Sequence, residues 1–170
     1  RLSLVGSEMC IRDSFNTKVL CGSHVPGLIQ KGKFELAQDY LDRTISQIET
    51  GICIGFGEIG IQHFDKSCGN EEIINTAGRQ SELILDKNNE IFLKMYDYAN
   101  KNSLLMDIHY EPARCQESPN TNQSVDYFKD VCRKYPNIKL SLAHTGMITS
   151  QKLEELITCL LYTSPSPRDS

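Results

Sequence analysis

Residues Ile52–Gly60 read ICIGFGEIG, a short run of β-branched residues, glycines and one phenylalanine that carries an acidic residue, Glu58, near its end. A run of this length and composition predicts a buried β-strand. Two later runs resemble it, LLMDIHY at Leu104–Tyr110 and IKLSLAHTGM at Ile138–Met147, and each carries a histidine where the apolar part ends. Each predicted strand therefore delivers one polar side chain to its carboxyl end.

Segments with helical periodicity separate the apolar runs. We expect strands at Lys18–Ser23, Ile52–Ile59, Leu104–His109 and Ile138–Ala143. We expect helices at Lys33–Thr50, at Asp86–Asn100 with Asp86 as N-cap, at Gln123–Tyr135, and from Ser150 to Ile157. The polar stretch Gln62–Leu85 is too long for an ordinary connection and predicts a functional loop or an insertion. Alternating strands and helices predict an α/β fold with a parallel sheet, either an open doubly wound sheet or part of a closed barrel.

The three polar residues at the strand ends are Glu58, His109 and His144. Parallel α/β barrels collect side chains from the carboxyl ends of their strands, so residues far apart in sequence meet there. A carboxylate and two imidazoles are common ligands of divalent metals. Either histidine alone is more often an ordinary hydrogen-bonded residue, but the joint placement favours ligation. We therefore predict that Glu58, His109 and His144 bind a metal.

Four short motifs occur in a fixed order: GSHVPG at Gly22–Gly27, GEIG around Glu58, the strand ending in His109, and AHTG around His144. Together they resemble the metal-dependent hydrolases of the amidohydrolase superfamily, and GSHVPG is similar to the GxHP element of the TatD-like branch. The resemblance covers residues 18–157. It implies a partial (β/α)8 TIM barrel, in which the four predicted strands are the third to the sixth of eight.

The resemblance also implies roles for the three predicted ligands. Glu58 matches the carboxylate that bridges two metals, and His109 and His144 match the histidines that bind one of them. The implied cofactor is one or two divalent ions, zinc or else manganese or a similar metal. A zinc-bound water has a pKa of about 7, so the ion provides hydroxide at neutral pH. The superfamily's HxH and its last-strand aspartate have no match here, so we expect activity from the intact parent protein and none from this chain alone.

Other residues near the predicted strand ends are candidates for contact with a substrate or with a metal-bound imidazole. His24 matches the GxHP histidine, although a loop histidine is an equal alternative. His63 and Lys66 could hold an anionic substrate group, whereas a solvated loop is the ordinary alternative. Glu111 could accept a hydrogen bond from an imidazole, and Arg114 could clamp a carboxylate or phosphate through two hydrogen bonds.

The expected function is water attack on an amide, ester or related bond of a small molecule. The nearest alternative is a TatD-like metal-dependent deoxyribonuclease, which GEIG and GSHVPG favour. The long segment after GEIG and the absence of a Lys/Arg cluster speak against a nucleic-acid partner without excluding it. A metal-dependent decarboxylase on the same barrel is a third possibility. A noncatalytic α/β binding domain is the alternative outside the enzymes.

The two ends of the chain, residues 1–14 and 159–170, are expected to derive from sequencing adapter. Val5–Asp13 (VGSEMCIRD) and Cys159–Pro167 (CLLYTSPSP) can be encoded by opposite strands of one DNA sequence. That DNA resembles a transposase adapter. Two unrelated natural peptides should not be encoded by opposite strands of the same DNA. We therefore expect residues 15–158 to be an internal piece of a barrel domain from a longer protein.

Composition places the chain among ordinary globular proteins, with 39% hydrophobic and 24% charged residues and a formal net charge of -4. No apolar run approaches the roughly 18 residues of a membrane span. The cysteines between the two ends are odd in number and show no CxxC spacing; they are Cys21, Cys53, Cys68, Cys115 and Cys132. We therefore expect reduced thiols and a cytoplasmic protein. A signal peptide and the oligomeric state stay open.

Overall fold

The computed structural model describes residues 19–65, 70–72, 82–114 and 121–143, together with Glu154 and Leu156. Glu154 and Leu156 are helical, in the region where a helix from Ser150 to Ile157 is expected. The predicted metal ligand His144 and the predicted substrate contact Lys66 lie outside the described residues. So do both expected adapter segments, residues 1–14 and 159–170.

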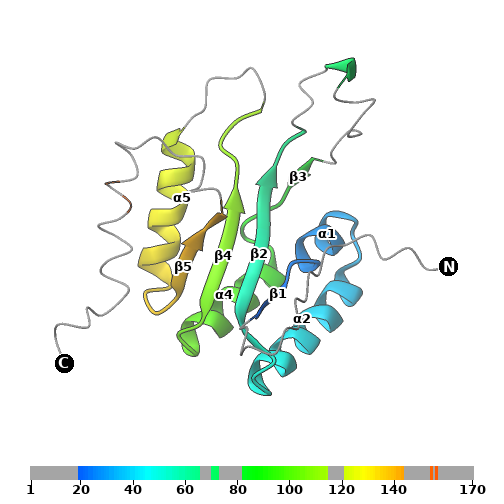
Figure 1. Cartoon of the computed structure of the whole chain (residues 1–170), viewed down its shortest axis with the longest axis vertical. Coiled ribbons are helices and arrows are strands. Elements are labelled where there is room, and N and C mark those ends of the chain that lie inside the picture. The colour runs from blue at the N-terminus through cyan, green and yellow to red at the C-terminus, as the bar shows by residue number, and fades with distance from the viewer. Residues whose placement is uncertain are drawn as a thin grey trace.

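The described strands form one sheet (Figure 1). Its parallel strands are β1 (Val19–Gly22), β2 (Cys53–His63), β4 (Leu105–Tyr110) and β5 (Lys139–Leu142). They lie side by side in the order β1-β2-β4-β5, so neighbours in the sheet follow one another along the chain. A short strand, β3 (Leu83–Ile84), pairs antiparallel with the end of β2. The four predicted strands and their parallel arrangement are confirmed.

The helices are α1 (Val25–Gln30), α2 (Phe34–Glu49), α4 (Glu90–Lys101) and α5 (Thr121–Lys134). The last three confirm the predicted helices. Helix α1 was not expected, because Pro26 and Gly27 look like a stop after β1. Pro26 instead stands in the first turn of α1, where its missing N–H costs no helical hydrogen bond. Within the described part of the chain, no helix has the length and apolar character needed to cross a bilayer.

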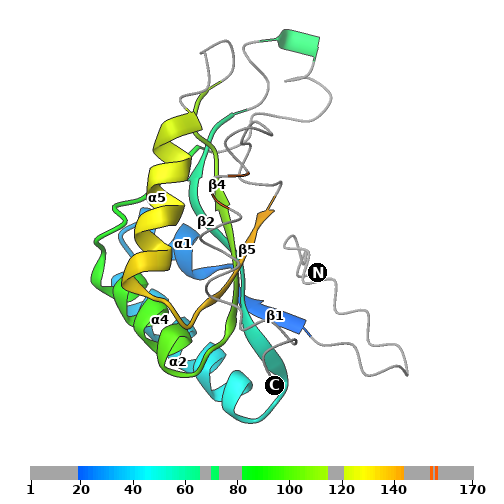
Figure 2. The same ribbon diagram turned by 90° about the vertical axis from the view of Figure 1, so that its left-hand side faces the viewer.

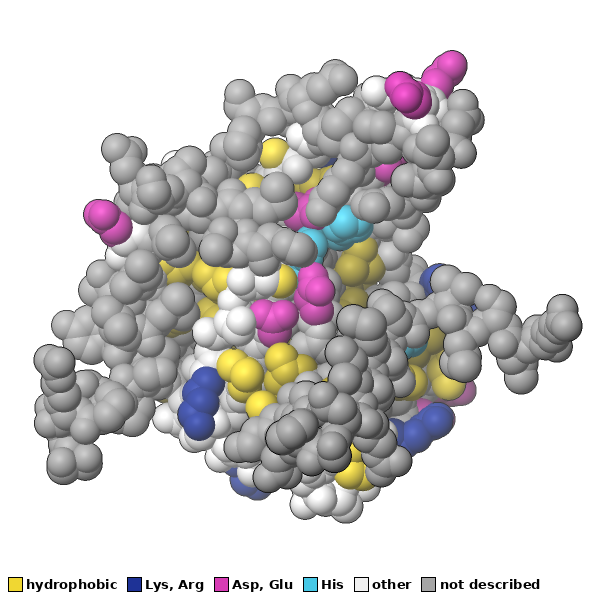
Figure 3. Space-filling view, viewed as in Figure 1, with side chains coloured by type: hydrophobic (Ala, Val, Ile, Leu, Met, Phe, Trp, Pro, Cys, Tyr) yellow, Lys and Arg dark blue, Asp and Glu magenta, His cyan; other side chains and the backbone are white. Residues whose placement is uncertain are grey.

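Helices α2, α4 and α5 all cover the same face of the sheet (Figure 2). Their apolar sides meet the sheet in one core, whose largest fully buried side chains include Phe56, Phe92 and Phe128. Burial of such side chains supplies most of the drive for folding, at about 1.5–3 kcal/mol for each of them. Figure 3 looks onto the opposite face, where side chains of Asp, Glu and His gather over the middle of the sheet.

Helix α4 begins differently from the prediction. Its N-cap is Asn89, whose side-chain oxygen accepts the N–H of Ile91 at 3.0 Å. Asp86, the expected N-cap, lies in the preceding turn, where its carboxylate accepts the N–H of Asn88 at 2.9 Å. Both residue types satisfy free backbone N–H groups well, and the turn at Lys87 and Asn88 moves the helix start by three residues.

Strand β2 is longer than the predicted strand, which ended at Ile59. It continues to His63, because Gln62 and His63 find partners in Ile84 and Leu83 of β3. The stretch from Gln62 to Leu85, expected to be a loop or insertion, thus begins and ends as sheet. Residues 66–69 and 73–81 of that stretch lie outside the described residues. The extension matters because it places His63 beside the end of β4.

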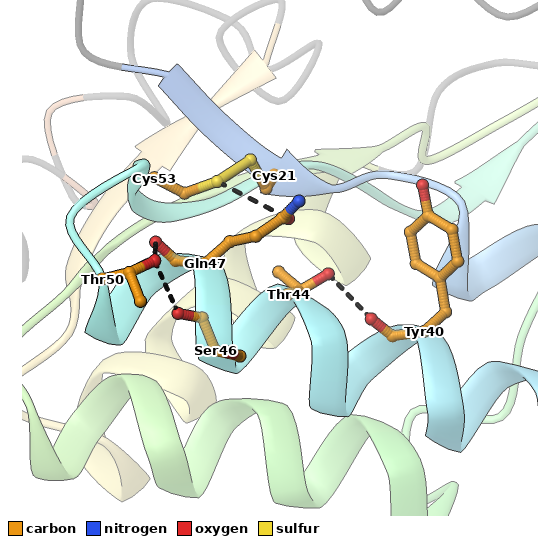
Figure 4. Close-up of a disulfide and its surroundings, with 7 residues drawn as sticks. All are labelled: Cys21, Tyr40, Thr44, Ser46, Gln47, Thr50 and Cys53. Atoms are coloured by element: carbon orange, nitrogen blue, oxygen red, sulfur yellow. Dashed lines mark hydrogen bonds between the residues drawn. A yellow bond between two sulfur atoms is a disulfide. The ribbon is translucent and has the colours of Figure 1, made fainter.

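Cys21 and Cys53 form a disulfide (Figure 4), so the expectation of reduced thiols is wrong for these two residues. Val19 pairs with Cys53 across β1 and β2, and Cys21 lies two residues further along β1 on the same side. Their Cα atoms are 6.0 Å apart, an ordinary separation for a bridge. Cys132 is buried and takes part in no disulfide. The cysteine spacing in sequence could not show that two strands 32 residues apart are neighbours.

Candidate metal centre

Three potential metal ligands meet at the carboxyl ends of β2 and β4. His63 is the last residue of β2, His109 is near the end of β4, and Glu111 directly follows that strand. One ligand atom from each lies within 4.8 Å of the others. His109 and Glu111 are buried, while His63 keeps about a quarter of its side chain exposed. A parallel sheet gathers its strand ends in this way, and the register of β2 against β4 brings these residues level.

The contacts within the group centre on one oxygen of Glu111. Glu111 Oε1 lies 2.9 Å from Nδ1 of His63 and 2.9 Å from Nε2 of His109. The same two ring nitrogens are 3.4 Å apart. Zinc bonds of about 2.0–2.1 Å in a tetrahedral site place neighbouring ligand atoms about 3.4 Å apart. The two nitrogens therefore already have the spacing of two ligands of one zinc ion. The carboxylate oxygen of Glu111 has to move away from them by only about half an ångström.

Glu58 contacts the same histidine from the other side. Its Oε1 lies 2.6 Å from Nδ1 of His109, and about half of its side chain is exposed. Both nitrogens of the His109 ring thus face a carboxylate, Glu58 at Nδ1 and Glu111 at Nε2. A proton on Nδ1 that is donated to Glu58 leaves Nε2 free to bind a metal, the arrangement found around most metal-bound histidines. The structure brings Glu58 and His109 together, and Glu58 lies beside the group of three. The ligand role expected for Glu58 stays a prediction.

Glu111 is held firmly in place. It is only 2% exposed, and its second oxygen, Oε2, accepts the backbone N–H of Phe64 at 2.9 Å. Its own N–H donates to the carbonyl of Gln62 at 2.9 Å, and the Gln62 side-chain amide donates to the carbonyl of Glu111 at 2.6 Å. These bonds compensate the cost of burying a carboxylate and fix one of its oxygens between the imidazoles. The expected contact of Glu111 with an imidazole is present and involves two.

Arg114, the predicted anion clamp, binds a carboxylate of its own chain. Its Nε and Nη2 donate to Glu82 Oε1 and Oε2 at 3.1 and 2.9 Å, and its guanidinium lies 5.2 Å from the centre of the Phe64 ring. The hydrogen bond from Arg114 lowers the pKa of Glu82. The bidentate geometry expected for a carboxylate substrate is therefore formed here with Glu82.

His24 is not brought into the group. It is exposed, stacks on the ring of Tyr40 with 5.3 Å between centroids, and has Nδ1 3.4 Å from the Ser23 hydroxyl. It stands just before α1, at the carboxyl end of β1. This is the end of the sheet predicted for it, but its structural contacts are those of a loop histidine.

Sequence reasoning placed His63 and Glu111 only at the edge of the site, as possible contacts. The signal for Glu111 was its spacing, because residues two apart in an extended chain point to the same side, as His109 and Glu111 do. His63 required knowledge that β2 continues beyond Ile59, and that depends on pairing with β3. The comparisons with protein-family models, with curated proteins and with solved structures found no match for this chain.

Proposed function

We propose that the protein is a metal-dependent hydrolase of the amidohydrolase superfamily that acts on an amide, ester or related bond of a small molecule. The observation that carries the proposal is the meeting of His63, His109 and Glu111 within 4.8 Å at the carboxyl ends of parallel strands. Two histidines and one glutamate are also the protein ligands of many catalytic zinc sites, where a fourth position stays open for water or substrate.

A (β/α)8 barrel is the fold that we propose around this site. In support, the strands follow one another in the sheet in chain order, and helices α2, α4 and α5 cover the same face. A doubly wound sheet would reverse its strand order and distribute helices over both faces. Strands β1, β2, β4 and β5 would be the third to the sixth of the barrel. The face seen in Figure 3, which carries Asp, Glu and His side chains among hydrophobic ones, would then point to the barrel interior.

Each residue of the group has a defined role in the proposed enzyme. His63 through Nδ1, His109 through Nε2 and Glu111 through Oε1 would hold a divalent ion, zinc or else manganese. When bound, such an ion lowers the pKa of a coordinated water to about 7 and polarises the bond under attack. Glu58 would accept the Nδ1 proton of His109 and so fix the orientation and protonation of that ring. The half-exposed carboxylate of Glu58 would also reach the substrate side of the site.

Metal binding by the chelator-treated protein tests the proposal. In a calorimetric titration we expect one zinc ion to bind per chain. His109→Gln should weaken the zinc affinity by more than about 100-fold. Glu58→Gln should weaken it less, by about 10–100-fold, because Glu58 acts through His109. His24→Gln is the matched control, since His24 is a histidine outside the group. Equal zinc affinity of the His109→Gln and unchanged proteins would reject the site and favour a noncatalytic binding domain.

The TatD-like deoxyribonuclease stays the second candidate, because the motifs GEIG and GSHVPG favour it. The two functions are separable in the intact protein. A hydrolase of small molecules should cleave amides or esters with a rate that depends weakly on ionic strength. A nuclease should cleave DNA, with binding that falls steeply as salt rises because counterions are released from the phosphates. Loss of either activity in His109→Gln would connect it to the metal centre.

A further inference from the structure

A second candidate binding site lies between α4 and α5, and its lining shares no residue with the metal group. It is a pocket of about 470 Å³, which lies within the usual range for sites that bind small molecules. Its apolar lining comes from Tyr96, Tyr127, Tyr135, Leu93 and Val131. The proposed hydrolase makes no use of any of these residues.

The three tyrosines are buried and pack together as the floor of the pocket. The rings of Tyr96 and Tyr135 are stacked with centroids 5.0 Å apart, and the hydroxyls of Tyr96 and Tyr127 are hydrogen-bonded to each other. Burial raises the pKa of both Tyr96 and Tyr127, so neither phenol becomes negatively charged near neutral pH. The hydroxyl of Tyr135 is buried and has no hydrogen-bond partner among the described residues. The floor is therefore aromatic, uncharged and not fully satisfied in its polar contacts.

The rim of the pocket is positively charged. Lys87, before α4, has Nζ 5.8 Å from the centre of the Tyr127 ring, and Lys134, at the end of α5, has Nζ 5.2 Å from that of Tyr135. Both lysines are exposed. Arg133 also lines the pocket, and Asp130 at 3.3 Å balances its charge. Two ammonium groups, one from each side, thus overhang an aromatic floor, and the one carboxylate among the described lining residues, Asp130, is paired with Arg133.

We propose that this pocket binds a small aromatic carboxylate, with its ring against the tyrosine floor and its carboxylate at Lys87 and Lys134. The floor favours a flat apolar body, because aromatic rings pack well against one another. The rim favours a compact negative charge at one end of that body. A phosphate group alone is a poorer match, because it would leave the tyrosine rings, Leu93 and Val131 of the lining uncovered.

Titration of the full chain with 2-naphthoate tests this site, in buffer with chelator so that no metal can bind the probe. We expect saturable binding with one probe per chain, and methyl shifts of Leu93 and Val131 in NMR spectra. The neutral probe 2-naphthalenemethanol should bind about tenfold more weakly, because a hydrogen bond to a charged group is lost. Inorganic phosphate, which has no apolar body, should not compete.

Two pairs of substitutions locate the binding. The double variant Lys87→Gln with Lys134→Gln should bind 2-naphthoate about tenfold or more weakly. Its affinity for the neutral probe should be unchanged. Lys31→Gln with Lys33→Gln, which removes the same charge from exposed positions before α2, is the matched control. All four lysines are exposed, so the variants should fold. The inference is overturned if the chelated protein does not bind 2-naphthoate, if both probes bind equally, or if the two pairs have the same effect.

Discussion

Glu111 is the residue on which the candidate metal centre depends most. It is buried, it contacts both imidazoles through one oxygen, and its other oxygen is held by the N–H of Phe64. Because its position is fixed before any ion binds, little reorganisation is needed on binding. A carboxylate so placed would supply both a ligand and the negative charge that balances a divalent cation.

Glu111→Gln should therefore abolish zinc binding while it keeps the shape of the side chain. The amide retains one oxygen, but the charge is lost, and we expect the affinity to fall by more than about 100-fold. Glu82→Gln is the matched control, since Glu82 is a nearby carboxylate paired with Arg114 outside the group. Calorimetric titration of both variants makes the comparison. If both variants lost the same affinity for zinc, negative charge in this region, and not the group of three, would hold the ion.

Tyr96 and Tyr127 predict how stability responds to alkali. Burial raises the pKa of both phenols in the folded protein above the value near 10 that they have when unfolded. Above pH 10 the unfolded chain loses these protons and the folded chain keeps them. The free energy of unfolding should thus keep its full value below pH 10, as far as these two phenols are concerned. It should fall as the pH rises from 10 toward the folded-state pKa.

Denaturant unfolding at a series of alkaline pH values, followed by circular dichroism, measures this dependence. Replacing both residues by phenylalanine should flatten the alkaline part of the curve. A slope that is unchanged in the double variant would assign the alkaline loss to other groups, such as Tyr98 or Tyr110, whose pKa burial also raises.

At the scale of single elements, the bridge between β1 and β2 is the strongest local constraint. It closes a segment with a sequence separation of 32 residues, which includes α1 and α2. Loop-closure entropy gives such a bridge about 3–4 kcal/mol of stabilisation. Dithiothreitol should lower the free energy of unfolding by this amount. In Cys21→Ser with Cys53→Ser, the reductant should have no effect. Equal sensitivity of the variant to dithiothreitol would contradict the bridge.

Most elements could be predicted from the sequence because their signals are local. Ile52–Ile59, Leu104–His109 and the helices around α2, α4 and α5 follow from runs and periods within one segment. What could not be predicted depends on partners distant in sequence. The extension of β2 to His63 needs β3, and the bridge from Cys21 to Cys53 needs neighbouring strands. The site shows the same division. The meeting of Glu58 with His109 follows from strand order, whereas the position of His63 beside His109 depends on the pairing of β2 with β3.

For the whole molecule, a bound ion would connect the ends of β2 and β4 across the middle of the sheet. Because an ion that binds only the folded chain stabilises it, zinc at 100 times its dissociation constant should add about 2.7 kcal/mol. For a chain of this size we expect the melting temperature to rise by roughly 5–10 °C. Differential scanning calorimetry with and without zinc measures the shift. His109→Gln should not show it, and a similar rise in that variant would point to ion binding elsewhere.

The sulfur bridge at the start of β2 has a consequence for a chain that has been cut. If a protease nicks the backbone anywhere between Gly22 and Ile52, the two pieces stay joined through Cys21 and Cys53. The severed N-terminal piece would remain anchored beside β2 and could not diffuse away. Breakage in the α1–α2 region would therefore leave a covalently whole molecule until a reducing agent separates its parts.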